Sequence, residues 1–298
     1  MHGPKDASVF AWQLWRDRRG RLSRVRLIVL ALLLVPVAKA LIDAGAIAHG
    51  ARPINELIHR AGFWTLVFLG VTLAATPLRS VARFAALADV RRMLGVGTFC
   101  YAVAHVLLYF ADQQFDLGKA AYEITHRWYL IVGGTAWLGL AALAATSTDG
   151  MVRRLGPLRW RRLHQLVYGI ALLALIHYFQ QTKADVTVPV FAAGLFGWLI
   201  LYRVLAWWQD THVLSTLSLL ALTLVASLLT FLGEAIGIGI AFHVSPMRVL
   251  ETVFDFSIGV RPGWQVLAAG VAVVALDLVR GWQDRRLREL KAKRRAAA

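Results

Sequence analysis

Residues 91–111 read RRMLGVGTFCYAVAHVLLYFA, two arginines followed by 19 residues without a lysine, arginine, aspartate or glutamate. A helix of about 20 mostly apolar residues is long enough to cross the hydrocarbon core of a bilayer. His105 lies inside this run, where an ionisable side chain is costly and usually marks a function. The stretch therefore predicts a membrane-spanning helix that carries a functional histidine.

The rest of the chain repeats this pattern. It has 298 residues, of which 58% are hydrophobic and 11 are tryptophan, and its mean hydropathy is +0.58, a composition that does not fit a soluble domain. Lipid cannot hydrogen-bond a free backbone, and the apolar runs lack the alternation of barrel strands, so each run should be a helix. We expect an all-α integral membrane protein with about eight spans, at residues 27–44, 61–78, 93–111, 128–146, 163–181, 187–206, 213–241 and 263–280.

The net charge of +16 is explained by membrane topology. Lysines and arginines stand in short clusters at the ends of the apolar runs, with 25 on one side of the membrane and seven on the other when loops are taken alternately. Cytoplasmic loops carry the excess of positive charge in membrane proteins. Both termini are therefore expected to be cytoplasmic, and nucleic acid is not an expected partner.

The expected spans suggest three regions. Residues 1–26 form a basic cytoplasmic N-terminus, residues 27–210 a six-helix core, and residues 211–298 a two-helix appendix with a basic tail. Cys100 is the only cysteine, which excludes an internal disulfide, a four-cysteine iron–sulfur site and covalent haem attachment through C-x-x-C-H. Any haem must be held non-covalently.

Two histidines are expected at the same depth. The third and fifth runs cross the membrane in the same direction, so residues equally far from their cytoplasmic arginines lie at equal depth. His105 follows Arg92 by 13 residues and His177 follows Arg162 by 15, which places both about 20 Å into the membrane at about 1.5 Å per residue. Two imidazoles at one depth on two helices can bind one iron from opposite sides, so a haem between them is the leading interpretation.

His164 lies near the cytoplasmic face, two residues past Arg162. It precedes His177 by 13 residues, and on a straight helix the two side chains are about 20 Å and well over 90° apart, so they cannot share a metal. Arg91 and Arg92 lie at its depth on the third run and suit haem propionates, a flavin phosphate or lipid headgroups. For each histidine the alternative role is a hydrogen bond to a neighbouring helix; zinc is less favoured, because the spans offer no nearby carboxylate or second cysteine.

Three segments, RRMLGVGTFCYAVAHVLLY, LAATSTDGMVRRLGPLRWRRLHQLVY and LIHYFQ, together resemble the haem-binding membrane subunit of the periplasmic methionine sulfoxide reductase system. The TPLR turn at Thr76–Arg79, the ELIHRAG segment around His59 and the pair Thr146 and Ser147 extend the resemblance, which runs from about residue 27 to residue 207. These motifs place the chain in the wider ferric reductase-like transmembrane family.

The resemblance implies a membrane electron carrier of the bacterial inner membrane, with catalysis on a partner. His105 and His177 would be axial ligands of an outer haem b, and His164 a ligand or neighbour of an inner cofactor. FMN is also associated with the family, although no motif here assigns its site. The family is thought to take electrons from quinol or a cytosolic flavin reductase and to pass them to a periplasmic molybdopterin-containing catalytic subunit, which repairs oxidised methionine in envelope proteins.

The chain departs from the family in two places. Where the family usually has Arg-Pro-Tyr before the fourth span, this chain reads HRWYL, with Trp128 in place of the proline. Residues 211–298 lie beyond the usual end of the family, and the resemblance assigns them no role.

Two other functions fit the sequence less well. A self-standing ferric or haem reductase carries a flavin and nicotinamide module, but no G-x-G-x-x-G follows a predicted strand here. A transporter that uses the histidines as a proton relay would show buried carboxylates along a path and repeat symmetry, of which the sequence offers little.

Three other groups have ordinary explanations beside functional ones. His59, near Glu56 and Arg60, suits a quinone or proton site, but a histidine in an exposed loop needs no function. Glu234 lies among glycines in the seventh run. Its carboxylate is expected to relay a proton, to extend toward the membrane surface or to form an ion pair with a loop arginine. Lys39 and Asp43 are spaced as an ion pair on a helix.

Overall fold

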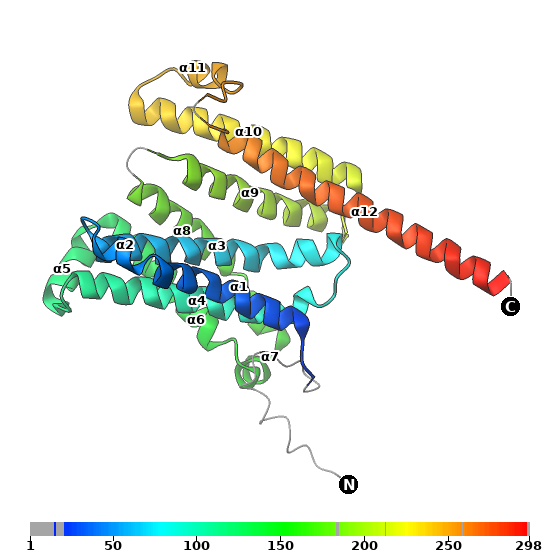
Figure 1. The fold of residues 1–298 in the computed structure, drawn as a ribbon, viewed down its shortest axis with the longest axis horizontal. Helices are drawn as coiled ribbons and strands as arrows, with labels where there is room; N and C mark the ends of the chain where they lie inside the picture. Colours follow the sequence, from blue (N-terminus) through cyan, green and yellow to red (C-terminus); the bar gives the residue numbers. More distant parts are fainter. Residues whose placement is uncertain (1–14, 16–20, 183–184, 212, 258, 297–298) are drawn as a thin grey trace, which may run out of the picture. The chain divides into compact units, whose positions relative to one another are not determined.

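The computed structural model describes residue 15 and residues 21–182, 185–211, 213–257 and 259–296, and these ranges fold into helices (Figure 1). They contain no β-strand element, so the all-α expectation is confirmed. The predicted basic N-terminus, residues 1–26, lies mostly outside the described residues. The helices are α1 (Arg24–Ile42), α2 (Ala44–Ala48), α3 (Pro53–Val81), α4 (Leu87–Asp112), α5 (Leu117–His126), α6 (Trp128–Ala145), α7 (Asp149–His164), α8 (Val167–Gln181), α9 (Thr187–Trp208), α10 (Thr216–Phe242), α11 (Pro246–Glu251) and α12 (Pro262–Ala296).

Eight helical segments in the described ranges are long and apolar enough to cross a membrane, and they match the eight predicted runs in order. α7 and α8 together form one of these segments. Large apolar side chains such as Ile28, Leu172 and Ile240 are exposed on the helices, an arrangement that suits lipid and not water. The chain is a multi-pass membrane protein.

α3 and α12 are among the helices that extend beyond the predicted runs. α3 begins at Pro53, so His59 lies on a helix and not in the loop that the sequence suggested. Proline suits the first turn of a helix, and Glu56 and Arg60 form an ion pair one turn apart, with Nη2 and Oε1 2.6 Å from each other. α12 continues to Ala296, because its basic end is rich in strong helix formers.

The chain divides into two compact units. Unit 1 comprises Met1–Thr72 and Ala86–His177, and unit 2 comprises Leu73–Ala85 and Tyr178–Ala298. α3 and α8 each contribute residues to both units. This division by compactness differs from the boundary expected near Asp210, which concerns where the family resemblance ends and stays a prediction.

In unit 1, α4 packs between α1 and α6. The packing of α1 and α4 is centred on a buried cluster of apolar side chains: Val29, Leu33, Phe68, Val90 and Leu94. A Cβ at Gly97 would lie 2.7 Å from Leu33 Cδ2, so glycine allows the close approach of α1. Tyr101 Oη donates a hydrogen bond to the Leu33 carbonyl at 2.6 Å and joins the same two helices.

The helix that was expected to carry both His164 and His177 is interrupted. α7 ends at His164, residues 165–166 form a turn, and α8 begins at Val167. A further kink lies within α7 at Gly156, whose φ of 74° only glycine adopts readily, followed by Pro157. The angle predicted for a straight helix therefore does not hold between the two histidines.

In unit 2, α9, α10 and α12 lie side by side (Figure 1). A Cβ at Gly270 would overlap Thr223, and Trp198 Nε1 donates to Thr223 Oγ1 at 3.1 Å, so small and polar residues bring the three helices together. Asp277 is buried on α12, where it accepts a hydrogen bond of 2.7 Å from Thr216 and lies 3.9 Å from an Arg83 amino group.

Candidate functional site

His105 lies on α4 with its ring against α3. Its Nδ1 is 2.8 Å from the carbonyl oxygen of Ile58. A Cβ at Gly62 would lie 3.1 Å from both Nδ1 and Cε1 of the ring. α3 thus offers the imidazole a hydrogen-bond acceptor and, one turn later, the space that a side chain would otherwise fill.

His177 on α8 is held by α6 in the same way. Its Nδ1 is 2.8 Å from the carbonyl oxygen of Tyr129. A Cβ at Gly133 would lie 2.7 Å from Nδ1 and 2.8 Å from Cε1. Each histidine therefore meets a carbonyl at position i and a glycine at position i+4 of the neighbouring helix.

The two rings face each other within unit 1. Their centroids are 6.3 Å apart and their planes are inclined by 82°. Because a carbonyl oxygen only accepts hydrogen bonds, each Nδ1 must donate, and the neutral imidazole then presents Nε2 as a lone pair. Metal-binding histidines are oriented by such a bond from their second nitrogen.

The described residues contain no group of three histidine, cysteine or acidic side chains that could hold a metal ion. His105 and His177 form a pair of imidazoles among those described residues. A haem iron needs only such a pair from the protein.

Two buried donors lie close by in the sequence of the same helices. Tyr109 follows His105 by one turn on α4, and Trp137 follows Gly133 by one turn on α6. Within the described chain, Tyr109 Oη and Trp137 Nε1 are buried without a hydrogen-bond partner. A buried donor left unpaired costs about 1–3 kcal/mol, so both groups are candidates to contact a bound molecule.

His164 has a different environment. Thr146 Oγ1 donates to the Ala142 carbonyl at 2.8 Å and lies 3.2 Å from His164 Nε2. Since the hydroxyl proton is used, the oxygen accepts from Nε2–H, which is the opposite tautomer to that of His105 and His177. The His164 ring also stacks on Trp160, with centroids 4.0 Å apart. In this arrangement His164 donates to Thr146 through Nε2, and its role as a ligand or neighbour of an inner cofactor stays a prediction.

The arginines predicted at the depth of His164 are near it. The charges of Arg91 and Arg92 both act on the imidazole. Arg92 also forms an ion pair with Asp149 at the start of α7. We refer to His164, Trp160, Arg91 and Arg92 as the inner group.

His59 is exposed on α3, beside a network of charges. Lys39 pairs with Asp43 at 3.0 Å, as the spacing predicted, and Arg60 Nη1 approaches the same carboxylate at 2.7 Å. These hydrogen bonds from Arg60 and Lys39 hold the pKa of Asp43 below its ordinary value. No contact of His59 in the described chain assigns it a quinone or proton role, which stays a prediction.

Part of the chain is similar to known proteins. Residues 61–175 match the family described as ferric reductase like transmembrane component; the matched range contains His105 and His164 and ends two residues before His177. The chain is 42% identical to the protein-methionine-sulfoxide reductase haem-binding subunit MsrQ of Rhodospirillum rubrum over 186 residues, which cover 62% of this chain and 88% of that protein.

Relatives of the same name give similar matches. The protein of Xanthomonas campestris pv. campestris is 45% identical over 161 residues, 54% of this chain and 73% of its own length. That of Xanthomonas oryzae pv. oryzae is 43% identical over 166 residues, 55% of this chain and 75% of its own length. No solved structure matches the chain.

Proposed function

The chain belongs to the family of protein-methionine-sulfoxide reductase haem-binding subunits, and we propose that it carries electrons on a haem b held between His105 and His177. The observation that carries the proposal is the pair of facing imidazoles, each held by a backbone carbonyl at Nδ1 with Nε2 left as a lone pair. The relatives are named for haem binding, which supports the same cofactor here.

The spacing of the two rings fits an iron between them. The ring centroids of His105 and His177 lie 6.3 Å apart, and a metal–imidazole bond is about 2 Å long, so these two residues would be placed to hold one iron. The unpaired donors of Tyr109 and Trp137 would be available to contact a bound haem.

Bound haem supplies a one-electron carrier whose potential depends on its axial ligands and surroundings. The chain's own part is to prepare the ligands. The carbonyls of Ile58 and Tyr129 fix the tautomer of each imidazole and raise its basicity. Gly62 and Gly133 let the rings sit against the helices without displacing them, and the apolar spans keep water away.

For the inner group we propose the role of neighbour to a second cofactor. Arg91 and Arg92 are suited to a haem propionate or an FMN phosphate, since guanidinium groups bind such anions with paired hydrogen bonds. His164, which donates through Nε2 to Thr146, would direct its Nδ1 lone pair elsewhere or reorient when a cofactor binds.

The proposed direction of electron flow is outward. Quinol or a cytosolic flavin reductase is the proposed donor, and a periplasmic molybdopterin-containing catalytic subunit is the proposed acceptor. The name shared by the relatives supports a methionine sulfoxide reductase partner. The excess of basic residues on one side supports an inner-membrane protein with both termini in the cytoplasm.

The contacts of the buried carboxylates give the transporter alternative no support. Among the described residues the buried acidic side chains are Glu234 and Asp277. Glu234 pairs with Arg261 at 3.1 Å, which is one of the arrangements expected for it, and Asp277 is bound by Thr216. Both carboxylates are therefore engaged in local contacts.

The test is an absorption spectrum of the detergent-purified protein, oxidised and then reduced with dithionite. We expect the bands of a low-spin b-type haem. A protein that is folded, as judged by gel filtration and circular dichroism, but that takes up no haem from the host or on titration with hemin would overturn the proposal.

A further inference from the structure

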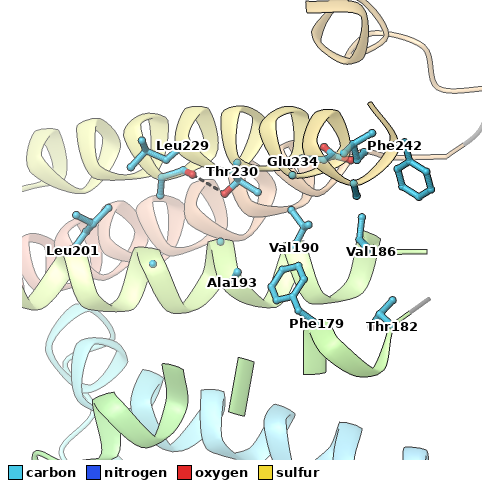
Figure 2. Close-up of a pocket in the computed structure, with 17 residues that line it drawn as sticks. Phe179, Thr182, Val186, Val190, Ala193, Leu201, Leu229, Thr230, Glu234 and Phe242 are labelled. Atoms are coloured by element: carbon cyan, nitrogen blue, oxygen red, sulfur yellow. Dashed lines mark hydrogen bonds between the residues drawn. The ribbon is translucent and has the colours of Figure 1, made fainter. Parts of the chain in front are cut away.

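A cavity of about 470 Å³ lies within unit 2, between the end of α8 and the facing sides of α9 and α10 (Figure 2). Its size is within the range of small-molecule sites, about 300–1,000 Å³. Four glycines line it, and at three of them, Gly197 on α9 and Gly233 and Gly237 on α10, an added Cβ would meet nothing within 4 Å. These glycines therefore open the cavity and are not needed for helix contact.

The cavity has an apolar end and a polar part. Figure 2 shows Leu201 and Leu229 at one end and Thr182 and Phe242 at the other. Glu234 lies between these ends along α10, eight residues before Phe242 and thus about 12 Å from the end of the helix. A ligand in the cavity would contact hydrocarbon side chains along most of its length and a carboxylate at one level.

One oxygen of the Glu234 carboxylate is hydrogen-bonded to Arg261, and the other can accept a hydrogen bond from a ligand. Glu234 is only 5% exposed, and its Oε1 accepts a hydrogen bond of 3.1 Å from Arg261. The described residues offer no hydrogen bond to Oε2. A carboxylate accepts several hydrogen bonds, so a ligand with an O–H or N–H group at this level would complete its contacts.

The charge of the pair restricts the ligand. Glu234 and Arg261 neutralise each other, so a net negative head group would bring an uncompensated charge into a site of low polarity. A neutral or zwitterionic head group with hydrogen-bond donors has no such cost.

We propose that this cavity binds one membrane amphiphile, with its apolar chain along Gly197 and Gly233 toward Leu201 and a hydrogen-bond-donating head group without net negative charge beside Glu234. Phosphatidylethanolamine and an isoprenoid hydroquinone share this chemistry. The site belongs to unit 2, and the inference does not depend on the haem assignment in unit 1.

The experiment measures the amphiphile directly. The full chain is purified in a mild detergent, and bound lipid is counted by native mass spectrometry and identified by extraction. Gly233→Leu and, from the opposite wall, Gly197→Leu would fill the cavity. Ala221→Leu is the matched control, because Ala221 is exposed on the same α10 and does not line the cavity.

We expect the wild type and Ala221→Leu to retain about one amphiphile per chain and the two filling variants to retain at least about tenfold less. Recovery of phosphatidylethanolamine, or of a quinone, identifies the source, and titration with added phosphatidylglycerol should give weaker binding than either. Equal retention by the wild type and by folded filling variants would overturn the proposal, as would a preference for phosphatidylglycerol. Because the readout is bound lipid, a chain that lacks haem still gives a result.

Discussion

Gly133→Ala is predicted to weaken the hydrogen bond that orients the His177 ring. The added Cβ would lie 2.7 Å from Nδ1, 0.7 Å short of the 3.4 Å at which ordinary contact begins. The ring must move away, which lengthens the 2.8 Å hydrogen bond from Nδ1 to the Tyr129 carbonyl. Loss of such a partner weakens metal binding by histidine about 10–100-fold, so we expect haem affinity to fall by at least about tenfold.

Two matched variants give the expected order. At Gly62 the added Cβ would lie 3.1 Å from the His105 ring, only 0.3 Å short of ordinary contact, so Gly62→Ala should have a smaller effect. Gly134 is next to Gly133 on α6, but a Cβ there meets nothing within 4 Å. Gly134→Ala should keep the haem and stabilise the helix by about 0.5–1 kcal/mol.

The assay is haem content per chain and the rate of haem loss to an apoprotein acceptor, measured for the four proteins side by side. The predicted order of loss is Gly133→Ala, then Gly62→Ala, then Gly134→Ala and the wild type together. Retention by Gly133→Ala equal to that of Gly134→Ala would refute the reasoning that the glycine makes room for a ligand ring.

Three further outcomes are expected. Tyr109→Phe removes a buried hydroxyl that has no partner among the described residues. Without haem, the variant should therefore be more stable than the wild type by about 1 kcal/mol, and with haem bound it should lose that advantage. An equal shift in thermal unfolding temperature for the haem-free and haem-bound proteins would contradict a contact between Tyr109 and the cofactor. Asp277→Ala removes the acceptor of Thr216 and should destabilise the protein in detergent by about 1–3 kcal/mol, with a smaller loss for Asp277→Asn; equal losses would show that this hydrogen bond is unimportant. The pKa of Asp43 is lowered by Arg60 and Lys39, so the stabilising contribution of Asp43 is present above pH about 4 and is lost as the pH falls through the lowered pKa. The difference in melting temperature between the wild type and Asp43→Asn should therefore shrink below that pH. A difference that stays constant with pH would exclude the ion pairs of Asp43 as the cause of the stabilisation.

The spans were predictable because the bilayer fixes the length of an apolar helix. The run that contains His105 has that length and no charge to interrupt it. The ends of α3 and α12 were not predictable in the same way, since a helix continues into the polar interface when its residues favour helix, as they do at Pro53 and toward Ala296. Hydropathy marks the part of a helix in lipid and does not mark its ends.

The pairing of His105 and His177 was predicted from depth alone, and the structure brings the two rings together. The carbonyls of Ile58 and Tyr129 were not predicted, because any backbone offers a carbonyl and only the packing of helices selects one. Gly62 and Gly133 lie against the rings of His105 and His177. A glycine at the depth of a histidine on a neighbouring span is the signal that would have identified both.

The break before α8 has a sequence signal nearby. Gly156 and Pro157 form a pair that interrupts helices, and it warns against treating residues 149–181 as one straight rod. The contact of His164 with Thr146 and Trp160 depends on this local bend, so sequence spacing alone could not place it.

The most direct test of the central claim is the low-temperature electron paramagnetic resonance spectrum of the ferric protein. If His105 and His177 hold a haem with their ring planes inclined by 82° as observed, the ferric protein would give a strongly anisotropic low-spin signal. His105→Ala and His177→Ala should each abolish this same signal. Its persistence in either variant would contradict the account that these two histidines hold one haem.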